Sequence, residues 1–378
     1  MKKALLVTSV ASMIKQFNMD NIQILKSLGY EVSVATNFKE PGTIPLVESQ
    51  RLKKELNDID VITYDISFTR NPFSVKNIKA YKKIKELMTN EIYNVVHCQS
   101  PVGGLITRLA YSPQKMNETK VIYTAHGFHF FNGSPIKNWL IYYPIEYLLT
   151  KKTDLLLTIN QEDYDRAKKM PFKKVAYIPG VGINLSDDFD KNQKNKVLKK
   201  EFNIDKNKVI ITSVGELNKN KNHKIVLKAL SRLKDKEFVY LICGKGIEKE
   251  NLKLLANKLE ISEKIKILGY RNDVVDILKG SDIFVFPSFR EGLPVSVLEA
   301  MDAKLPIICT EIRGNTDLID EGKGGYLVTP YDEEKIVKKL AVLLNNKELR
   351  KKMGHYNKLK CMTYSNEKVN ALMREIYK

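Results

Sequence analysis

Two glutamates stand eight residues apart in a segment that joins an apolar run to a predicted helix. The segment reads FPSFREGLPVSVLEA over residues 286–300. Pro294 suits the first helical turn, because a residue there needs no backbone N–H donor. The pattern therefore places Glu291 just before the helix and Glu299 about one and a half turns inside it. Gly292 allows a ligand to approach the backbone closely.

The start of that helix can serve as an anion site. The backbone N–H groups of Leu293, Val295 and Ser296 have no acceptor within the helix and can point at an anion. This geometry suits a diphosphate at the helix start, with the carboxylate of Glu299 deeper in to accept ribose hydroxyls. An ordinary capped helix with surface glutamates fits the same residues, so the residues alone leave both interpretations open.

A histidine follows another short apolar run. His126 comes after Val121–Thr124, at the carboxyl edge of a predicted sheet. An imidazole there can hydrogen-bond a substrate hydroxyl or the reacting centre. A strand-end histidine satisfied by the backbone is the structural alternative.

The elements that must position these residues alternate between short apolar strands and helices. In the first half the predicted strands are Ala4–Thr8, Glu31–Thr36, Val61–Tyr64, Val95–His97, Val121–Thr124 and Leu155–Ile159. In the second half they are Val209–Val214, Phe238–Cys243, Ile265–Leu268, Ile283–Pro287, Pro306–Cys309 and Tyr326–Val328. Such alternation predicts parallel sheets covered by helices on both faces. Between Pro179 and Asn207 the pattern lapses into polar, turn-forming residues, which we interpret as the linker between two doubly wound domains.

Several segments, taken in order, resemble one enzyme family. Around the two glutamates, the pattern F-P-S-x-x-E-G-x-P-x-x-x-L-E-A resembles the signature of the retaining glycosyltransferases of family four, which have the GT-B fold. The accompanying segments of the second half are VGELNKNKNH (214–223), LICGKG (241–246), LGYRNDVVDIL (268–278), RGNTDLI (313–319) and GGYLV (324–328). In the first half, VVHCQSPVGGL (95–105), YTAHGFHFF (123–131) and IPGVGI (178–183) are similar to the capsule and exopolysaccharide branch. The resemblance spans nearly the whole chain.

The resemblance implies an α/β protein of the GT-B class. Two Rossmann-like doubly wound domains would face each other across a cleft, and a C-terminal helix would return to the N-terminal domain. We expect residues 1–185 to form the acceptor-binding domain and residues 186–360 the nucleotide-sugar-binding domain. Residues 361–378 would form the returning helix.

The implied activity is retaining glycosyl transfer. A UDP-sugar would donate a hexose or N-acetylhexosamine to a polyprenyl-diphosphate-linked saccharide, in capsule, exopolysaccharide or related cell-surface glycan synthesis. Two alternatives stay open. One is a sugar-nucleotide epimerase of the same fold, and the other is a non-catalytic basic membrane-associated protein with a degenerate site.

The resemblance also assigns roles to residues. The expected catalytic residues are His126, Glu291 and Lys221, with Glu291 on the donor sugar hydroxyls and Lys221 on the leaving diphosphate. The nucleotide and its diphosphate are expected to contact Lys219, Gly244, Tyr270, Arg271, Gly292, Leu293, Val295 and Glu299.

One position departs from the family pattern. Five residues before Lys221, where the family has arginine, this chain has Glu216. A glutamate there would repel a diphosphate. We expect either that Lys219, Lys245 or Arg271 supplies the missing charge, or that Glu216 turns away and orients Lys221.

No metal or other cofactor is expected. Asp-x-Asp triplets, which hold metals in many transferases, occur at residues 58–60, 163–165 and 188–190. None of them ends a strand near the expected donor site, so we interpret all three as solvated surface. Cations and a helix N-terminus would then neutralise the leaving diphosphate.

Two segments are candidates for the acceptor or membrane side. In SVKNIKAYKKIKELMT (74–89), apolar residues recur every three positions at Val75, Ile78, Tyr81 and Ile84. The lysines between them include Lys76, Lys79, Lys82 and Lys83. The second segment, 128–152, is aromatic and includes Trp139, Tyr142 and Tyr143. Both patterns suit an anionic membrane interface, whereas a lysine-rich Rossmann helix and a buried aromatic core are the alternatives.

The composition indicates where the protein acts and what kind of partner it binds. The net charge is +19, which favours an anionic partner, but no recognised nucleic-acid-binding motif accompanies it, so we expect no nucleic acid. No apolar run reaches the roughly 20 residues that cross a bilayer. Four scattered cysteines without a CxxC pair suit a reducing cytosol. We therefore expect a cytoplasmic protein, peripheral on the inner face of the plasma membrane, whose oligomeric state the sequence leaves open.

Overall fold

The computed structural model describes residues 2–69, 71–72, 74–114, 116 and 118–378. The chain divides into two compact units. Unit 1 consists of the residues up to Gly182 together with Glu367–Lys378, and unit 2 consists of Ile183–Asn366. Each unit has its own sheet and its own apolar core.

Unit 1 is built on a parallel sheet in the order β3-β2-β1-β4-β5-β6-β7. The strands are β1 (Lys2–Val7), β2 (Tyr30–Thr36), β3 (Ile62–Asp65), β4 (Val95–Gln99), β5 (Lys120–Ala125), β6 (Leu155–Thr158) and β7 (Val175–Tyr177). The central strands are buried along their length because helices cover both faces. The short edge strand β7 is only half-buried, and the sequence pattern did not predict it.

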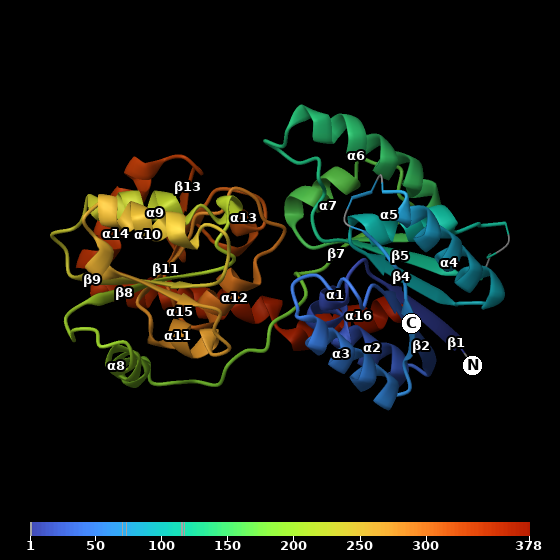
Figure 1. Ribbon diagram of the computed structural model, residues 1–378, viewed down its shortest axis with the longest axis horizontal. Helices are drawn as coiled ribbons and strands as arrows, with labels where there is room; N and C mark the ends of the chain where they lie inside the picture. The colour runs from blue at the N-terminus through green and yellow to red at the C-terminus, as the bar shows by residue number, and fades with distance from the viewer. Residues whose placement is uncertain (1, 70, 73, 115, 117) are drawn as a thin grey trace. The chain divides into compact units, whose positions relative to one another are not determined.

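The helices of unit 1 fall into two layers (Figure 1). On one face of the sheet lie α1 (Ala11–Phe17), α2 (Met19–Ser27), α3 (Leu46–Asp58) and α16 (Asn366–Tyr377). On the other lie α4 (Lys76–Asn90), α5 (Pro101–Ala110), α6 (Ile136–Leu149) and α7 (Gln161–Ala167), with the 3-10 helix η1 (Thr150–Lys152) after α6. A large apolar core fills the space between the sheet and α4, α5 and α6.

Unit 2 repeats the plan with a parallel sheet in the order β10-β9-β8-β11-β12-β13. Its strands are β8 (Val209–Val214), β9 (Phe238–Cys243), β10 (Ile265–Gly269), β11 (Ile283–Phe286), β12 (Ile307–Thr310) and β13 (Gly325–Val328). Its helices are α8 (Lys191–Glu201), α9 (His223–Ser231), α10 (Lys249–Lys258), α11 (Val274–Gly280), α12 (Val295–Asp302), α13 (Asn315–Leu318), α14 (Glu333–Asn345) and α15 (Lys347–Cys361). Three 3-10 turns join them: η2 (Lys219–Lys221), η3 (Ser262–Lys264) and η4 (Met362–Tyr364).

The prediction of two Rossmann-like parallel-sheet domains is confirmed. The boundaries differ in detail. The chain enters unit 2 at Ile183, slightly before the expected position, and returns to unit 1 at Glu367, later than residue 361. The return is late because Cys361 and Tyr364 are buried in the core of unit 2. The expected linker also holds a helix, α8, which begins at an Asp190 cap and packs on α11.

Candidate functional site

The loop that follows β8 brings a lysine back over the sheet of unit 2. It contains the short turn η2, whose first amides are capped because the Asn218 side chain accepts a hydrogen bond from Lys221 N at 3.1 Å. Asn222 then takes a left-handed conformation, with φ of 52°, before α9 begins. As a result, Lys221 Nζ lies 4.5 Å from the centre of the Phe286 ring, at the end of β11.

Lys221 forms an ion pair with Glu291. Lys221 Nζ lies 2.7 Å from Glu291 Oε1, and the two side chains are only 19% and 14% exposed. The backbone carbonyl of Glu291 accepts a hydrogen bond from Arg313 Nε at 3.0 Å. A cation, a carboxylate and a guanidinium therefore meet beside the end of β11.

Backbone contacts fix the two loops that carry this pair. Phe289 N donates to Asn220 O at 2.8 Å, and Asn220 Nδ2 donates to Arg290 O at 3.0 Å. The loops approach each other because β8 and β11 are neighbours in the sheet. No sequence pattern predicted these hydrogen bonds of Asn220.

The N-terminus of α12 lies next to Glu291 and is uncapped. Pro294 occupies the cap position and provides no side-chain acceptor. Within the part of the chain that the structure describes, the amides of Leu293, Val295 and Ser296 have no hydrogen-bond partner. These amides and the helix dipole can therefore receive an anion.

Glu299 lies half-buried inside α12. Burial raises the pKa of its carboxyl to about 7, and the nearby charge of Asp302 raises it further in the same direction. Among the described residues, no side chain or amide donates to this carboxylate. Near neutral pH it can therefore both donate to and accept from a ligand hydroxyl.

Gly244 and Gly246 permit close contact between the loops after β8 and β9. A Cβ at Gly244 would lie 1.9 Å from the carbonyl oxygen of Gly215, and a Cβ at Gly246 would lie 2.2 Å from that of Leu217. Leu217 N also donates to Lys245 O at 2.8 Å. This close packing explains why both positions are glycine. It also fixes the loop that leads to Lys221.

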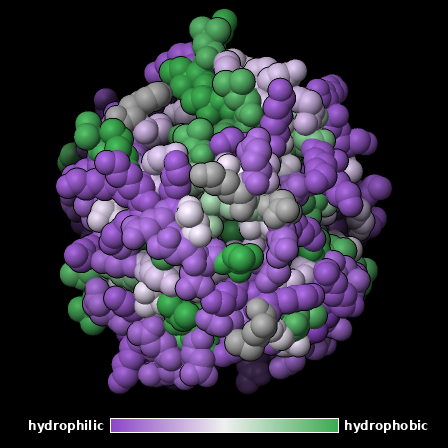
Figure 2. Space-filling model, turned by 90° about the vertical axis from the view of Figure 1, so that its right-hand side faces the viewer, coloured by the Kyte–Doolittle hydropathy of each residue, from purple (hydrophilic) through white to green (hydrophobic). Residues whose placement is uncertain are grey.

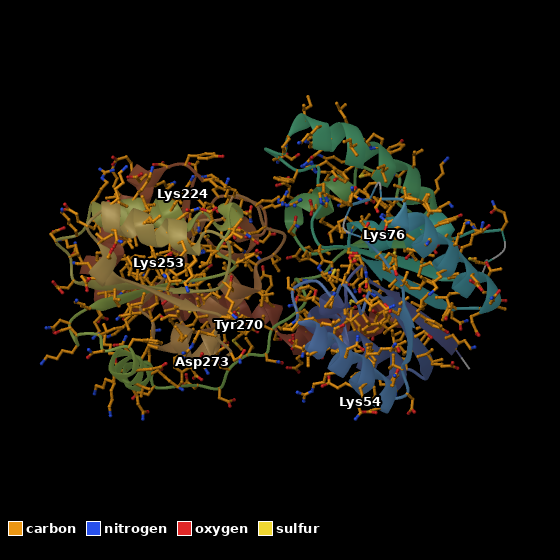
Figure 3. The ribbon with its side chains drawn as sticks, in the orientation of Figure 1. Lys54, Lys76, Lys224, Lys253, Tyr270 and Asp273 are labelled. Atoms are coloured by element: carbon orange, nitrogen blue, oxygen red, sulfur yellow. The ribbon has the colours of Figure 1, made fainter. Side chains whose placement is uncertain are left out.

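Arg271 is held by acidic neighbours. Its guanidinium contacts both oxygens of Asp273 and lies 2.9 Å from Glu201 Oε1. These carboxylates neutralise the guanidinium that was expected as one replacement for the family arginine. Tyr270 is exposed beside it, with the Lys245 ammonium 5.5 Å from its ring centre (Figure 3).

Glu216 and Lys219 are both exposed. Neither side chain makes an ion pair within the described residues. Glu216 does not orient Lys221 as one of the two expectations required, because Glu291 forms the ion pair with that lysine.

His126 follows β5 in unit 1 and is half-buried. Its Nε2 lies 2.8 Å from Gln99 Oε1, and its ring lies 5.2 Å from that of Phe17. Gln99 Nε2 in turn donates to Asn18 Oδ1 at 2.5 Å. Burial lowers the pKa of His126 to about 4, so the imidazole is neutral at pH 7. The contact of Gln99 with His126 could have been expected, because Gln99 ends β4 next to β5. No sequence pattern indicated that Asn18 would join them.

The basic helix α4 covers the sheet of unit 1 with small and polar as well as apolar side chains. Its buried side chains are Asn77, Ala80, Ile84 and Met88, whereas Val75 and Ile78 are exposed. Of the apolar residues that recur every three positions, Ile84 is buried and Tyr81 is half-buried. The four lysines at positions 76, 79, 82 and 83 are all exposed.

The aromatic helix α6 has an unusual outer surface. Trp139, Tyr142 and Tyr143 are partly buried against the core of unit 1. Ile136, Leu140 and Leu148 are more than 70% exposed. Figure 2 shows apolar side chains gathered at the top of the view, where α6 of unit 1 lies.

The Asp-x-Asp triplets include one buried aspartate. Asp163 Oδ2 accepts hydrogen bonds from Phe128 N at 3.0 Å and from Asn160 Nδ2 at 2.9 Å. The interpretation of this triplet as solvated surface was therefore wrong, because Asp163 ties two loops together. Across the described chain, no three His, Cys, Asp or Glu side chains gather closely enough to hold a metal ion. None of its described helices is both long and apolar enough to cross a membrane.

Comparison with known proteins covers both units. Residues 3–160 match the family model described as glycosyl transferase 4-like, and residues 194–360 match that of glycosyl transferases group 1. The putative glycosyltransferase EpsD of Bacillus subtilis (strain 168) is 33% identical over 381 residues, which cover 100% of this chain and 96% of the relative.

A second sequence relative and a solved structure are also similar to this chain. The UDP-Gal:alpha-D-GlcNAc-diphosphoundecaprenol alpha-1,3-galactosyltransferase of Escherichia coli is 28% identical, over 80% of this chain and 79% of the relative. The crystal structure of Anabaena Alr3699/HepE in complex with UDP and glucose superposes with a TM-score of 0.74 at 14% identity, over 100% of this chain and 99% of that one. The chain therefore belongs to the glycosyltransferases, with a glycosyl transferase 4-like first half and a group 1 second half, and it has their GT-B fold.

Proposed function

We propose that this glycosyltransferase is a retaining, metal-independent enzyme. It transfers a hexose or N-acetylhexosamine from a UDP-sugar to a saccharide linked through diphosphate to a polyprenol. The observation that carries the proposal is the meeting of Lys221, Glu291 and the uncapped start of α12 beside β11. The Escherichia coli relative, by its name, uses UDP-Gal and a diphosphoundecaprenol-linked acceptor.

The positive groups of this site suit a diphosphate leaving group. As the bond between the sugar and the diphosphate breaks, negative charge grows on the phosphate oxygen, and fixed positive groups stabilise that charge without reorganising. Lys221 Nζ and the amides of Val295 and Ser296 are such groups. Because they come from the protein, the reaction needs no metal at this position.

The carboxyl groups suit the rest of the donor. Glu299, with its pKa near 7, can exchange hydrogen bonds with ribose hydroxyls. Glu291 would bind donor sugar hydroxyls once the diphosphate draws Lys221 away from it. The acceptor hydroxyl would attack from the face that the diphosphate leaves, and its proton would pass to the leaving phosphate oxygen. His126, neutral at pH 7, would hydrogen-bond the donor sugar.

Thermal unfolding with UDP, GDP, ADP and CDP in EDTA tests the donor site. A ligand that binds only the native state stabilises it by about 2.7 kcal/mol at 100 times its Kd. We expect a UDP-selective shift that Lys221→Ala abolishes. Lys224→Ala removes an exposed lysine on α9 (Figure 3) and should leave the shift unchanged.

Other outcomes have distinct meanings. A shift that appears only after a divalent metal is added contradicts metal independence. No shift with any nucleotide supports a non-catalytic protein, and turnover of a UDP-sugar without any acceptor supports an epimerase.

We also propose that the protein acts in the cytoplasm on the inner face of the plasma membrane. The lysines of α4 and the exposed apolar side chains of α6 lie on the same face of the sheet of unit 1, on either side of α5. Exposed apolar side chains combined with lysines bind anionic bilayers.

Vesicle flotation tests this surface. The protein should float with vesicles that contain phosphatidylglycerol more than with neutral vesicles, and Leu148→Glu on α6 should reduce flotation several-fold. Leu254→Glu is the matched control, because Leu254 is an equally exposed leucine on α10 of unit 2. Flotation that does not depend on anionic lipid, or that both variants reduce equally, would refute the membrane proposal.

A further inference from the structure

Unit 1 contains a cavity of about 390 Å³ at the carboxyl ends of β1, β4 and β5. Its lining mixes polar and apolar side chains. Small polar side chains come from the loops and helix starts after β1 and β2, namely Ser9, Ser12, Gln16 and Thr43, and further polar side chains come from Ser100, His129 and Glu146. Apolar side chains come from α5, the loop after β5 and α6, namely Val102, Leu105, Phe128, Phe130 and Ile145. Such a lining suits an amphiphile.

The lining carries no free positive charge. Glu146 is its one carboxylate among the described residues, and Arg108 binds both of its oxygens, at 2.8 and 3.0 Å. Arg108 is fully buried and lies 3.8 Å from the centre of the Tyr123 ring. No lysine or arginine in the described lining faces the cavity. A phosphate group would therefore find no cation inside, and the cavity favours an apolar group.

Helix α6 connects this cavity with the apolar surface of the molecule. Tyr142, Ile145 and Glu146 line the cavity, whereas Leu140 and Leu148 of the same helix are 72% and 73% exposed. Exposed apolar side chains on the outside of a helix whose Ile145 lines a cavity suit a helix that lies next to lipid.

We propose that this cavity holds the isoprenoid units next to the diphosphate of the lipid-linked acceptor. The isoprenoid chain packs against α5 and α6 inside the cavity, and the diphosphate stays outside it. The proposal rests on the proposed function, because it takes the acceptor to be a polyprenyl diphosphate. It adds that unit 1 recognises the lipid itself, so that the chain length and branching of the acceptor affect binding directly.

A leucine pair on α5 provides matched variants. Leu105 lines the cavity, whereas Leu109, one turn later, does not line it and is 45% exposed. Leu105→Phe narrows the cavity, and Leu109→Phe makes the same change on the surface. The chain has a single tryptophan, Trp139, whose ring lies 5.7 Å from that of the cavity residue Phe130. Its fluorescence reports binding in all three proteins.

The experiment titrates the full chain with geranyl diphosphate and with inorganic diphosphate in EDTA. We expect geranyl diphosphate to bind the unaltered protein at least about ten-fold more tightly than inorganic diphosphate. Leu105→Phe should remove that advantage, and Leu109→Phe should keep it. Equal binding of the two ligands by the unaltered protein, or an undiminished advantage in Leu105→Phe, would overturn the proposal. If Leu105→Phe does not fold, Ile145→Phe narrows the same cavity from α6.

The UDP measurement separates this inference from the proposed function. A UDP shift without selective binding of geranyl diphosphate refutes the lipid cavity alone. Selective binding of geranyl diphosphate without a UDP shift keeps the cavity as an isoprenoid site and refutes the donor assignment.

Discussion

At the scale of single residues, the carboxyl of Glu299 should make stability depend on pH. Its pKa is about 7 in the folded protein, against an ordinary value of 4.5. Between these pH values the folded state keeps a proton that the unfolded state has released, so the free energy of unfolding falls as pH rises. Glu299→Gln has no such proton to lose. It should therefore be more stable than the unaltered protein at pH 8, by on the order of 1–3 kcal/mol, and equal to it at pH 4.

Urea denaturation at the two pH values measures this difference. Glu311→Gln is the control, because Glu311 is exposed in the same unit and makes no ion pair within the described residues. The account of Glu299 fails if both variants gain the same stability at pH 8, or if Glu299→Gln gains as much at pH 4.

The positions of Glu291 and Glu299 were predictable from the sequence, but the ion pairs of nearby residues were not. The spacing around Pro294 placed Glu291 before the helix and Glu299 within it, and both lie there. The contact between Lys221 and Glu291 was not predictable from spacing, since it depends on β8 and β11 being neighbours in the sheet. The ion pair of Arg271 with Glu201 was also not predicted, because Glu201 lies in a helix that the sequence pattern did not show.

At the scale of elements, Gly244 should control the loop that holds Lys221. A methyl group at this position would meet the carbonyl oxygen of Gly215 at 1.9 Å, so the loop after β8 would have to move. Gly244→Ala should cost about 1–3 kcal/mol of unfolding free energy and weaken UDP binding. Thermal unfolding with and without UDP measures both effects.

A second glycine separates this clash from backbone strain. Gly322 has φ of +76° but has no atom within 4 Å of a Cβ placed there. Gly322→Ala should therefore cost about 1 kcal/mol from its left-handed backbone alone and leave UDP binding unchanged. Weakened UDP binding in Gly322→Ala, or unchanged binding in Gly244→Ala, would contradict the role given to the loop contact.

Elements with strong patterns were predictable, and weakly patterned ones were not. The buried strands of both sheets have β-branched apolar runs that the sequence shows plainly. Helix α8 buries Leu198 alone among eleven mostly polar residues, so it has no apolar face to detect. The buried face of α4 has no plain apolar pattern, because the small and polar residues Ala80 and Asn77 are buried there while Ile78 is exposed.

At the scale of the whole molecule, unit 2 is an insertion in the chain of unit 1. The chain leaves unit 1 after Gly182 and returns at Glu367. The two ends of unit 2 meet, because Ile183 N donates to Tyr364 O at 3.1 Å and Asn366 N donates to Ile183 O at 2.9 Å. The resemblance to the family predicted the return of the chain, but the bridge between the two ends has no local sequence pattern.

This closed arrangement predicts that deleting residues 367–378 destabilises unit 1 and spares unit 2. In α16, the Tyr377 hydroxyl lies 2.6 Å from His97 Nδ1, and Lys120 Nζ donates to Ile376 O at 2.6 Å. The deletion also exposes the apolar surface that Val369 and Met373 cover, and each such buried side chain contributes about 1.5–3 kcal/mol.

Hydrogen exchange of the deletion protein distinguishes the two units. The amides of β1 and β4 should exchange much faster than in the full chain, because the deletion uncovers the sheet beside His97. The amides of β8 and β11 should exchange at their original rates, since the bridge between Ile183 and Asn366 is intact. UDP binding should persist for the same reason. Deleting Lys378 alone removes an exposed residue and should change neither unit. If β8 and β11 lost protection together with β1 and β4, the two units would fold as one cooperative body, and the insertion would not be independent.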